Sequence, residues 1–193
     1  MMSSLTDQEL MSRVQAGDFD PAAEIFDRYS RRIYNFALRY LKNSEAAEDA
    51  TQEVFVKMMR NAHQFQGDAK LSTWLFSITA NHCRDHLRKA DNKPKEPEEV
   101  LHRISGDSVA ADEEIEKEQE RQRVRDALQF LTPEQREVIL LSRYEGLSYA
   151  EIARIAGCSE GAVKTRVFRA METLKKVLTN EKDGDDKWMN AAH

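Results

Sequence analysis

Four side chains near the start of one predicted helix have the chemistry needed to read DNA base edges: Lys164, Thr165, Phe168 and Arg169. Lysine and arginine can donate hydrogen bonds to the O6 and N7 atoms of guanine, and threonine can bind a base edge or a phosphate. Phenylalanine can contact a thymine methyl group. A helix that carries such side chains at its N-terminal end is typical of proteins that bind the major groove of DNA.

The two helices that position these residues are predicted from caps and apolar spacing. Ser148 and Glu151 form a capping box that begins the first helix. Gly157 suits the left-handed residue that ends it, and Ser159 can cap the second helix at once. The second helix has one apolar face at helical spacing, made by Val163, Val167, Ala170, Leu174 and Val177. This pattern predicts a helix-turn-helix, and the alternative is an ordinary helical hairpin with a solvated outer face.

A polar, mostly acidic stripe lies on an earlier predicted helix, which runs from about residue 44 to residue 62. Its members recur at three- and four-residue spacing along the helix: Glu45, Glu48, Asp49, Gln52 and Glu53. Most charged stripes are solvated faces with no further role. The other interpretation is a docking surface for a basic or polar helix of a partner protein, with Asp49, Gln52 and Glu53 as the first candidates.

The segment that follows this helix, 64–70, has the composition of a site for an unpaired base. Such a base needs an apolar platform and hydrogen-bonding groups, and Phe65, Gln66 and Asp68 offer both. The next helix, predicted from about residue 72 to residue 89, adds groups that can contact nucleotides or phosphates: Asn81, Arg84 and Arg88. Alternatively, Phe65 fills the core of its domain, and we expect the same of at least one of Trp74 and Phe76.

His82, Cys83 and His86 form a cluster with metal-ligand chemistry on the same helix. Two histidines four residues apart can share a metal ion, and a cysteine adds a soft ligand. A fourth ligand is not evident, so we expect a partly buried helix face with no metal or other cofactor. No catalytic arrangement of residues is recognisable either, and we do not expect an enzyme.

The chain as a whole is predicted to be all-α, with two small helical domains. Its 193 residues include only seven glycines and four prolines, and helical periodicity dominates. We expect domains at 5–90 and 112–178, a flexible acidic linker at 91–111 and a disordered tail at 179–193. The net charge of −5 comes largely from acidic residues in and next to the linker, whereas 146–178 is basic. This distribution is compatible with DNA binding by the second domain.

The composition also predicts a cytoplasmic protein. Two cysteines form no disulfide framework. The polar N-terminus is not a signal peptide, and no stretch is long and apolar enough to cross a membrane.

Three segments, taken in order, make the chain similar to a known family. They are the opening LMSRVQAGDFDPAAEIFDRY, the stretch from AEDATQEVF to HLRK at 47–89, and the stretch from LTPEQREVI to METLKK at 131–176. They resemble the extracytoplasmic-function (ECF) sigma factors of bacterial RNA polymerase, of the sigma-E type. The second segment looks like conserved region 2 and the third like region 4. A lone helix-turn-helix is a weak signal, but the pair of regions at this length is a specific one.

The resemblance implies an alternative sigma factor that directs promoter-specific initiation of transcription. Region 2 would bind the β′ clamp helices of core RNA polymerase through Asp49, Gln52 and Glu53, and would capture a flipped base of the −10 element in the loop that contains Phe65. Region 4 would contact the β flap and read the −35 element with the four side chains described first. The resemblance also implies an anti-sigma factor, often membrane-bound, that covers both domains.

Two other functions remain open for the same residues. Another two-domain helix-turn-helix activator would share the second domain and bind DNA without polymerase. An interaction protein of the sigma pathway would use the basic face only as a solvated surface. The acidic stripe and the aromatic loop argue against both, because neither protein has a use for them.

Overall fold

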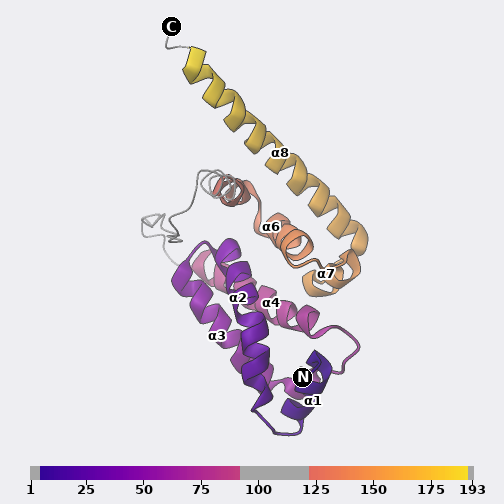
Figure 1. Ribbon diagram of the computed structural model, residues 1–193. Coiled ribbons are helices and arrows are strands. Elements are labelled where there is room, and N and C mark those ends of the chain that lie inside the picture. The colour runs from indigo at the N-terminus through magenta and orange to yellow at the C-terminus, as the bar shows by residue number, and fades with distance from the viewer. Residues whose placement is uncertain (1–4, 92–121, 191–193) are drawn as a thin grey trace.

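The computed structural model describes residues 5–91 and 122–190, with side chains described up to residue 179 (Figure 1). Within these ranges every regular element is helical and no strand occurs, which confirms the prediction of an all-α chain. The expected linker lies almost entirely outside the described residues. None of the helices in the described part of the chain is both long enough and apolar enough to span a membrane.

The N-terminal bundle, as we call residues 5–91, contains four α-helices and a short 3-10 helix. They are α1 (Asp7–Gln15), α2 (Pro21–Leu41), α3 (Ser44–Arg60), η1 (Ala62–Gln64) and α4 (Leu71–Asp91). Helix α2 is central, because it contacts each of the other three α-helices. Its Phe36 ring meets that of Phe76 on α4 edge to face, with centroids 5.7 Å apart. Phe76 is fully buried, in agreement with the core interpretation.

Local sequence predicts two caps at the start of this bundle: Thr6 with Glu9, and Asp20 before Pro21. Thr6 and Glu9 do form a capping box at the start of α1. Pro21 occupies the first turn of α2, but the side chain of Asp20, an expected cap, makes no capping hydrogen bond because Asp20 itself has helical backbone angles. The cap of α3 is Asn43, whose side chain accepts a hydrogen bond from the Ala46 N–H at 2.8 Å.

The C-terminal bundle, residues 122–190, is built around the helix-turn-helix. Residues 122–127 are helical and are followed by η2 (Leu128–Phe130), α6 (Pro133–Ile139), a π-helical turn η3 (Leu140–Tyr144), α7 (Tyr149–Ala156) and α8 (Glu160–Asn190). Thr132 and Gln135 form the capping box of α6, as their spacing predicts. The apolar side of α8 packs on α6 and α7, and Leu140, Leu141 and Ile152 are fully buried in the resulting core.

Helix α8 continues past residue 178, the predicted end of the second domain. Its helical backbone reaches Asn190. No proline interrupts residues 160–190, so nothing in the backbone forces the helix to stop. In Figure 1 this end of α8 projects away from the rest of the molecule.

Candidate DNA and polymerase interfaces

The helix-turn-helix has the local geometry that its sequence predicts. The Ser148 hydroxyl accepts a hydrogen bond from the Glu151 N–H, and the Glu151 carboxylate accepts one from the Ser148 N–H at 2.8 Å. Gly157 has φ of +61°, in the left-handed region. The Ser159 hydroxyl then accepts a hydrogen bond from the Ala162 N–H at 3.2 Å and caps α8.

The outer face of α8 presents the four predicted base-reading side chains to solvent. Lys164, Thr165, Phe168 and Arg169 are all exposed, and Phe168 has 64% of its surface exposed. On the opposite side of the helix the predicted apolar face is buried, except for the partly buried Val177. The exposed ring of Phe168 adds an apolar group to this otherwise basic and polar face. Arg166 lies off this face and has its guanidinium 3.6 Å from the Cys158 sulfur.

The acidic stripe of α3 also faces solvent. Asp49 and Gln52 are exposed, as are Glu45 and Glu48 nearer the start of the helix. Glu53 is half-buried, with a carboxylate oxygen 3.9 Å from the Lys57 ammonium one turn further on. The opposite face, with Ala47, Ala50 and Val54, is fully buried in the bundle.

The loop between η1 and α4, residues 65–70, places its aromatic and polar groups differently. Phe65 is only 8% exposed, and its ring packs against that of the half-buried Trp74 with centroids 5.5 Å apart. Gln66 and Asp68 are exposed beside it. The burial of Phe65 agrees with the core interpretation, and the hydrogen-bonding groups of the loop are the part that DNA could reach directly.

Helix α4 brings two of the predicted DNA-binding residues together. The Arg84 guanidinium donates a hydrogen bond to the side-chain oxygen of Asn81 at 2.7 Å. It also donates to the backbone carbonyl of Ile155 on α7 at 2.9 Å and lies 3.5 Å from the Glu137 carboxylate on α6. Arg88, one turn further along, is exposed and pairs with Asp85 at 2.9 Å. Arg84 therefore touches the C-terminal bundle, whereas Arg88 does not.

The contact between the two bundles contains several polar residues that sequence reasoning missed. Arg32 on α2 pairs with Glu145 at 2.9 Å, although the Glu145 side chain is only 5% exposed. Arg136 donates a hydrogen bond to the Tyr40 carbonyl at 2.9 Å. Glu151 accepts one from the Thr73 hydroxyl at 3.0 Å. The available signal was the charged pair Arg136–Glu137 directly before the apolar run 138–141, where the helix becomes buried and charges require partners.

Burial and pairing shift the pKa values of the acidic groups in this contact. Burial raises the pKa of Glu137 and of Glu145, and the neighbouring Arg84 and Arg32 oppose that rise. Glu151 differs: burial acts to raise its pKa, but hydrogen bonds from Ser148 and Thr73 outweigh burial and lower the pKa to about 2. Glu151 is therefore firmly ionised.

The cluster of His82, Cys83 and His86 does not form a metal site in this arrangement. Cys83 is fully buried, and burial raises the pKa of its thiol to about 12. The His82 Nδ1 atom faces the Lys57 ammonium at 3.4 Å, and burial together with that positive charge lowers the pKa of His82. Among the described residues, no three histidine, cysteine or acidic side chains are placed to hold a metal ion.

Two family models match the two bundles. Sigma-70 region 2 matches residues 25–93, and Sigma-70 region 4 matches residues 121–174. The first match includes the acidic stripe, the 65–70 loop and α4. The second includes the helix-turn-helix with its four solvent-facing side chains.

Whole-chain relatives agree with these matches. The chain is 32% identical to the RNA polymerase sigma-H factor of Pseudomonas aeruginosa, over 92% of this chain and 96% of that protein. It is also 32% identical to the ECF RNA polymerase sigma-E factor of Escherichia coli, over 90% and 95%. A solved structure of CnrH with the cytosolic domain of CnrY is 25% identical, with a TM-score of 0.68 over 90% of this chain and 97% of CnrH. The sigma factor RpoE of Bartonella quintana, solved with the anti-sigma factor NepR, is 26% identical, with a TM-score of 0.64 over 81% and 96%. By these likenesses the chain belongs to the ECF sigma factors of the sigma-70 family.

Proposed function

We propose that this protein is an alternative sigma factor that binds core RNA polymerase and directs it to specific promoters. The observation that carries the proposal is the presence, on one chain of this family, of two solvent-facing surfaces with different chemistry. One is the acidic stripe on α3, and the other is the basic and aromatic face of α8. The first suits a protein partner and the second suits duplex DNA.

The acidic stripe is the proposed docking surface for the β′ clamp helices of the polymerase. Asp49 and Gln52 project from a helix whose opposite face is fully buried, so the stripe is held rigidly. A rigid acidic face favours rapid and specific association with a basic or polar helix, because complementary charge steers the encounter.

The face of α8 is the proposed reader of the −35 element. Lys164 and Arg169 would contact guanine edges, and Phe168 would contact a thymine methyl group. Each well-made base contact contributes roughly 1–3 kcal/mol of discrimination. The β flap is the proposed polymerase contact of the same bundle.

The 65–70 loop and α4 are the proposed site for the separated −10 strand. The exposed Gln66 and Asp68 supply hydrogen-bonding groups for a flipped base, and the pair of the buried Phe65 and the half-buried Trp74 shapes the apolar wall beneath them. Asn81, Arg84 and Arg88 would contact the strand along α4. For Arg84 this requires release from Glu137 and from the Ile155 carbonyl, so separation of the bundles accompanies DNA capture.

An anti-sigma factor is the proposed inhibitor of this protein. Two solved structures with TM-scores above 0.6 are complexes: CnrH with the cytosolic domain of CnrY, and the sigma factor RpoE with the anti-sigma factor NepR. Such a partner would cover the polymerase and DNA surfaces of both bundles.

Run-off transcription with purified Escherichia coli core polymerase tests the proposed function. A pool of duplexes with randomised −35 and −10 elements serves as template, and the expected result is RNA from a selected subset only when the chain is added. No transcript from any template would contradict the proposal. Tight, sequence-specific duplex binding by the chain without polymerase would instead favour the helix-turn-helix activator.

A further inference from the structure

Gln15, the last residue of α1, holds the backbone of the neighbouring loop at two points. Its side-chain Nε2 donates hydrogen bonds to the carbonyl oxygens of Ala62 at 2.9 Å and Phe65 at 2.6 Å. Phe65 is where the chain leaves η1 and enters the 65–70 loop. Fixing the Phe65 carbonyl therefore fixes the direction in which Gln66 and the following residues leave η1.

A second side chain of α1 meets the loop further along. Gln8 lies two helical turns before Gln15, on the same side of α1, and the two are separated by about 10 Å along the helix axis. A β-carbon added to Gly67 would lie 2.8 Å from the Gln8 Nε2, which shows how closely this side chain approaches the loop. Gly67 has φ of +79°, a conformation that favours glycine. Helix α1 thus borders the loop from its entry at Phe65 to its bend at Gly67.

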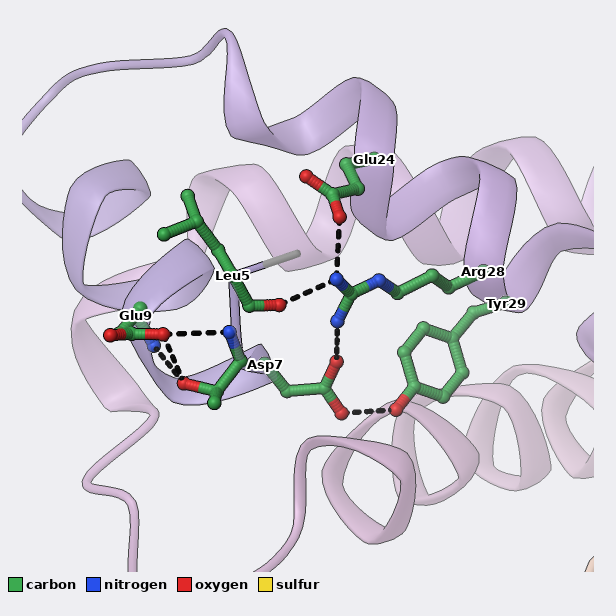
Figure 2. Close-up of polar contacts among 7 residues, drawn as sticks. Leu5, Asp7, Glu9, Glu24, Arg28 and Tyr29 are labelled. Carbon is green, nitrogen blue, oxygen red and sulfur yellow. Dashed lines mark hydrogen bonds and ion pairs between the residues drawn. The ribbon is translucent and has the colours of Figure 1, made fainter. Parts of the chain in front are cut away.

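Helix α1 is itself anchored firmly to α2, as Figure 2 shows. The Asp7 carboxylate accepts a hydrogen bond from Arg28 at 2.8 Å and another from the Tyr29 hydroxyl. The same guanidinium also binds the Glu24 carboxylate and the Leu5 carbonyl. The apolar side of α1 is buried in the core of the bundle through Leu10, Met11 and Val14. A helix fixed on two sides can serve as a rigid edge for a loop.

We infer that α1 sets the conformation of the 65–70 loop for strand capture, and that Gln15 is its positioning residue. This inference rests on the proposed function of the loop in binding the −10 strand. Gln15 acts through the backbone and needs no contact with DNA. Its amide is suited to the role because it presents two N–H donors, and the two donors match the two carbonyl acceptors.

Substitutions at Gln15 distinguish the effect of its hydrogen-bond donors from the effect of its size. Gln15→Glu keeps the size of the side chain but turns a carboxylate toward two carbonyl oxygens. Gln15→Leu removes the donors without adding charge, and Gln15→Lys keeps N–H donors at similar reach. Ser12→Leu is the control, because Ser12 is exposed on the same helix and its hydroxyl binds none of the described residues.

The measurements use Escherichia coli core polymerase and a promoter selected by the unaltered chain from the randomised pool. They are holoenzyme affinity, the amount of open complex, and the ratio of transcription from this promoter to that from versions with single −10 bases replaced. We expect Gln15→Leu to reduce the amount of open complex by roughly 3- to 10-fold. It should also lower the ratio of transcription from the selected promoter to transcription from its −10 variants. Gln15→Glu should lower both quantities further. The lysine variant and the control should resemble the parent, and holoenzyme affinity should not change.

A loss that came only from weakened folding would lower transcription from all promoters equally. If the ratio is unchanged in Gln15→Leu, or falls equally in Gln15→Lys, the positioning role is wrong. The loop variants Gln66→Ala and Asp68→Ala separate the two proposals. If they reduce base discrimination while Gln15→Leu does not, only the role of Gln15 fails. If they leave discrimination unchanged as well, the proposed function of the loop fails.

Discussion

The proposed DNA surface on α8 and the proposed DNA site around α4 are built in different ways. The α8 face belongs to one helix, and its four predicted side chains all point to solvent. The α4 site combines that helix with the 65–70 loop and with α1, and its Arg84 is engaged by the C-terminal bundle. A rigid duplex can be read by a surface that is already formed. A flexible single strand needs a site assembled from several segments, and such a site can be closed by the rest of the molecule.

The acidic stripe resembles the α8 face in this respect, since it too is one side of one helix. Asp49→Lys should therefore abolish association with core polymerase, by more than about 100-fold, because like charges that face each other cost several kcal/mol. The measurement is holoenzyme formation by gel filtration or fluorescence anisotropy. Asp27→Lys makes the same charge change at an exposed position of α2 and should have little effect. Normal holoenzyme with Asp49→Lys would rule out the stripe as a docking surface.

Substitutions on the α8 face should impair promoter recognition without disturbing the rest of the protein. The double variant Lys164→Ala and Arg169→Ala should lower promoter use by roughly 30- to 25,000-fold, at about 1–3 kcal/mol for each of the two contacts. Holoenzyme affinity should remain that of the parent. Lys176→Ala, at an exposed position further along α8, is the control. A parallel loss of polymerase binding would mean that these residues have another role.

The loop should show two separable effects. Phe65→Ala should destabilise the protein by about 3 kcal/mol, because it leaves a cavity beside Trp74. Gln66→Ala, at the exposed neighbour, should reduce open-complex formation and leave stability unchanged. Urea unfolding and permanganate reactivity of the promoter measure the two effects. Full stability of Phe65→Ala would show that its ring is not part of the core.

The contact between the bundles should respond to a charge swap. Glu145→Arg places two positive charges together at Arg32 and should shift the free chain toward a larger radius of gyration in small-angle X-ray scattering. Combining it with Arg32→Glu should restore the parent value at least in part, an effect of about 1 kcal/mol. Arg31→Glu changes the same charge at an exposed neighbouring position and serves as control. An unchanged radius for Glu145→Arg would indicate that the pair does not hold the bundles together.

The smallest effect concerns pH. The folded-state pKa of Glu151 is about 2, below its ordinary value of 4.5, so its stabilising contribution is present above pH 4.5 and is lost as pH falls toward 2. Glu151→Gln should therefore reduce the dependence of unfolding free energy on pH in that range. Glu137 and Glu145 have raised pKa values and act in the opposite direction, losing stability as pH rises above 4.5. An unaltered pH dependence in Glu151→Gln would contradict the hydrogen-bonded role of this carboxylate.

Much of the helical structure can be predicted from the residues themselves. Capping boxes, apolar periodicity and the left-handed Gly157 each act within a few residues, so the helix-turn-helix was predicted with its buried and exposed faces. The same holds for the acidic stripe, because the spacing of its residues places them on one side of a helix whatever that helix packs against. The helical backbone of α8 runs on past Asn180 and Gly184, residue types that often end helices, so local sequence did not indicate where it ends.

The packing of the helices governs which partners the polar and aromatic groups outside these patterns contact. Phe65 is buried because Trp74 lies beside it, and Arg84 is paired because α6 and α7 pack near α4. The bonds from Gln15 to the loop join residues about fifty positions apart in the chain. Contacts over such separations depend on the packing of whole helices. Local sequence thus sets the helices and their faces, whereas packing sets which charged and aromatic side chains face solvent and are available for the proposed DNA contacts.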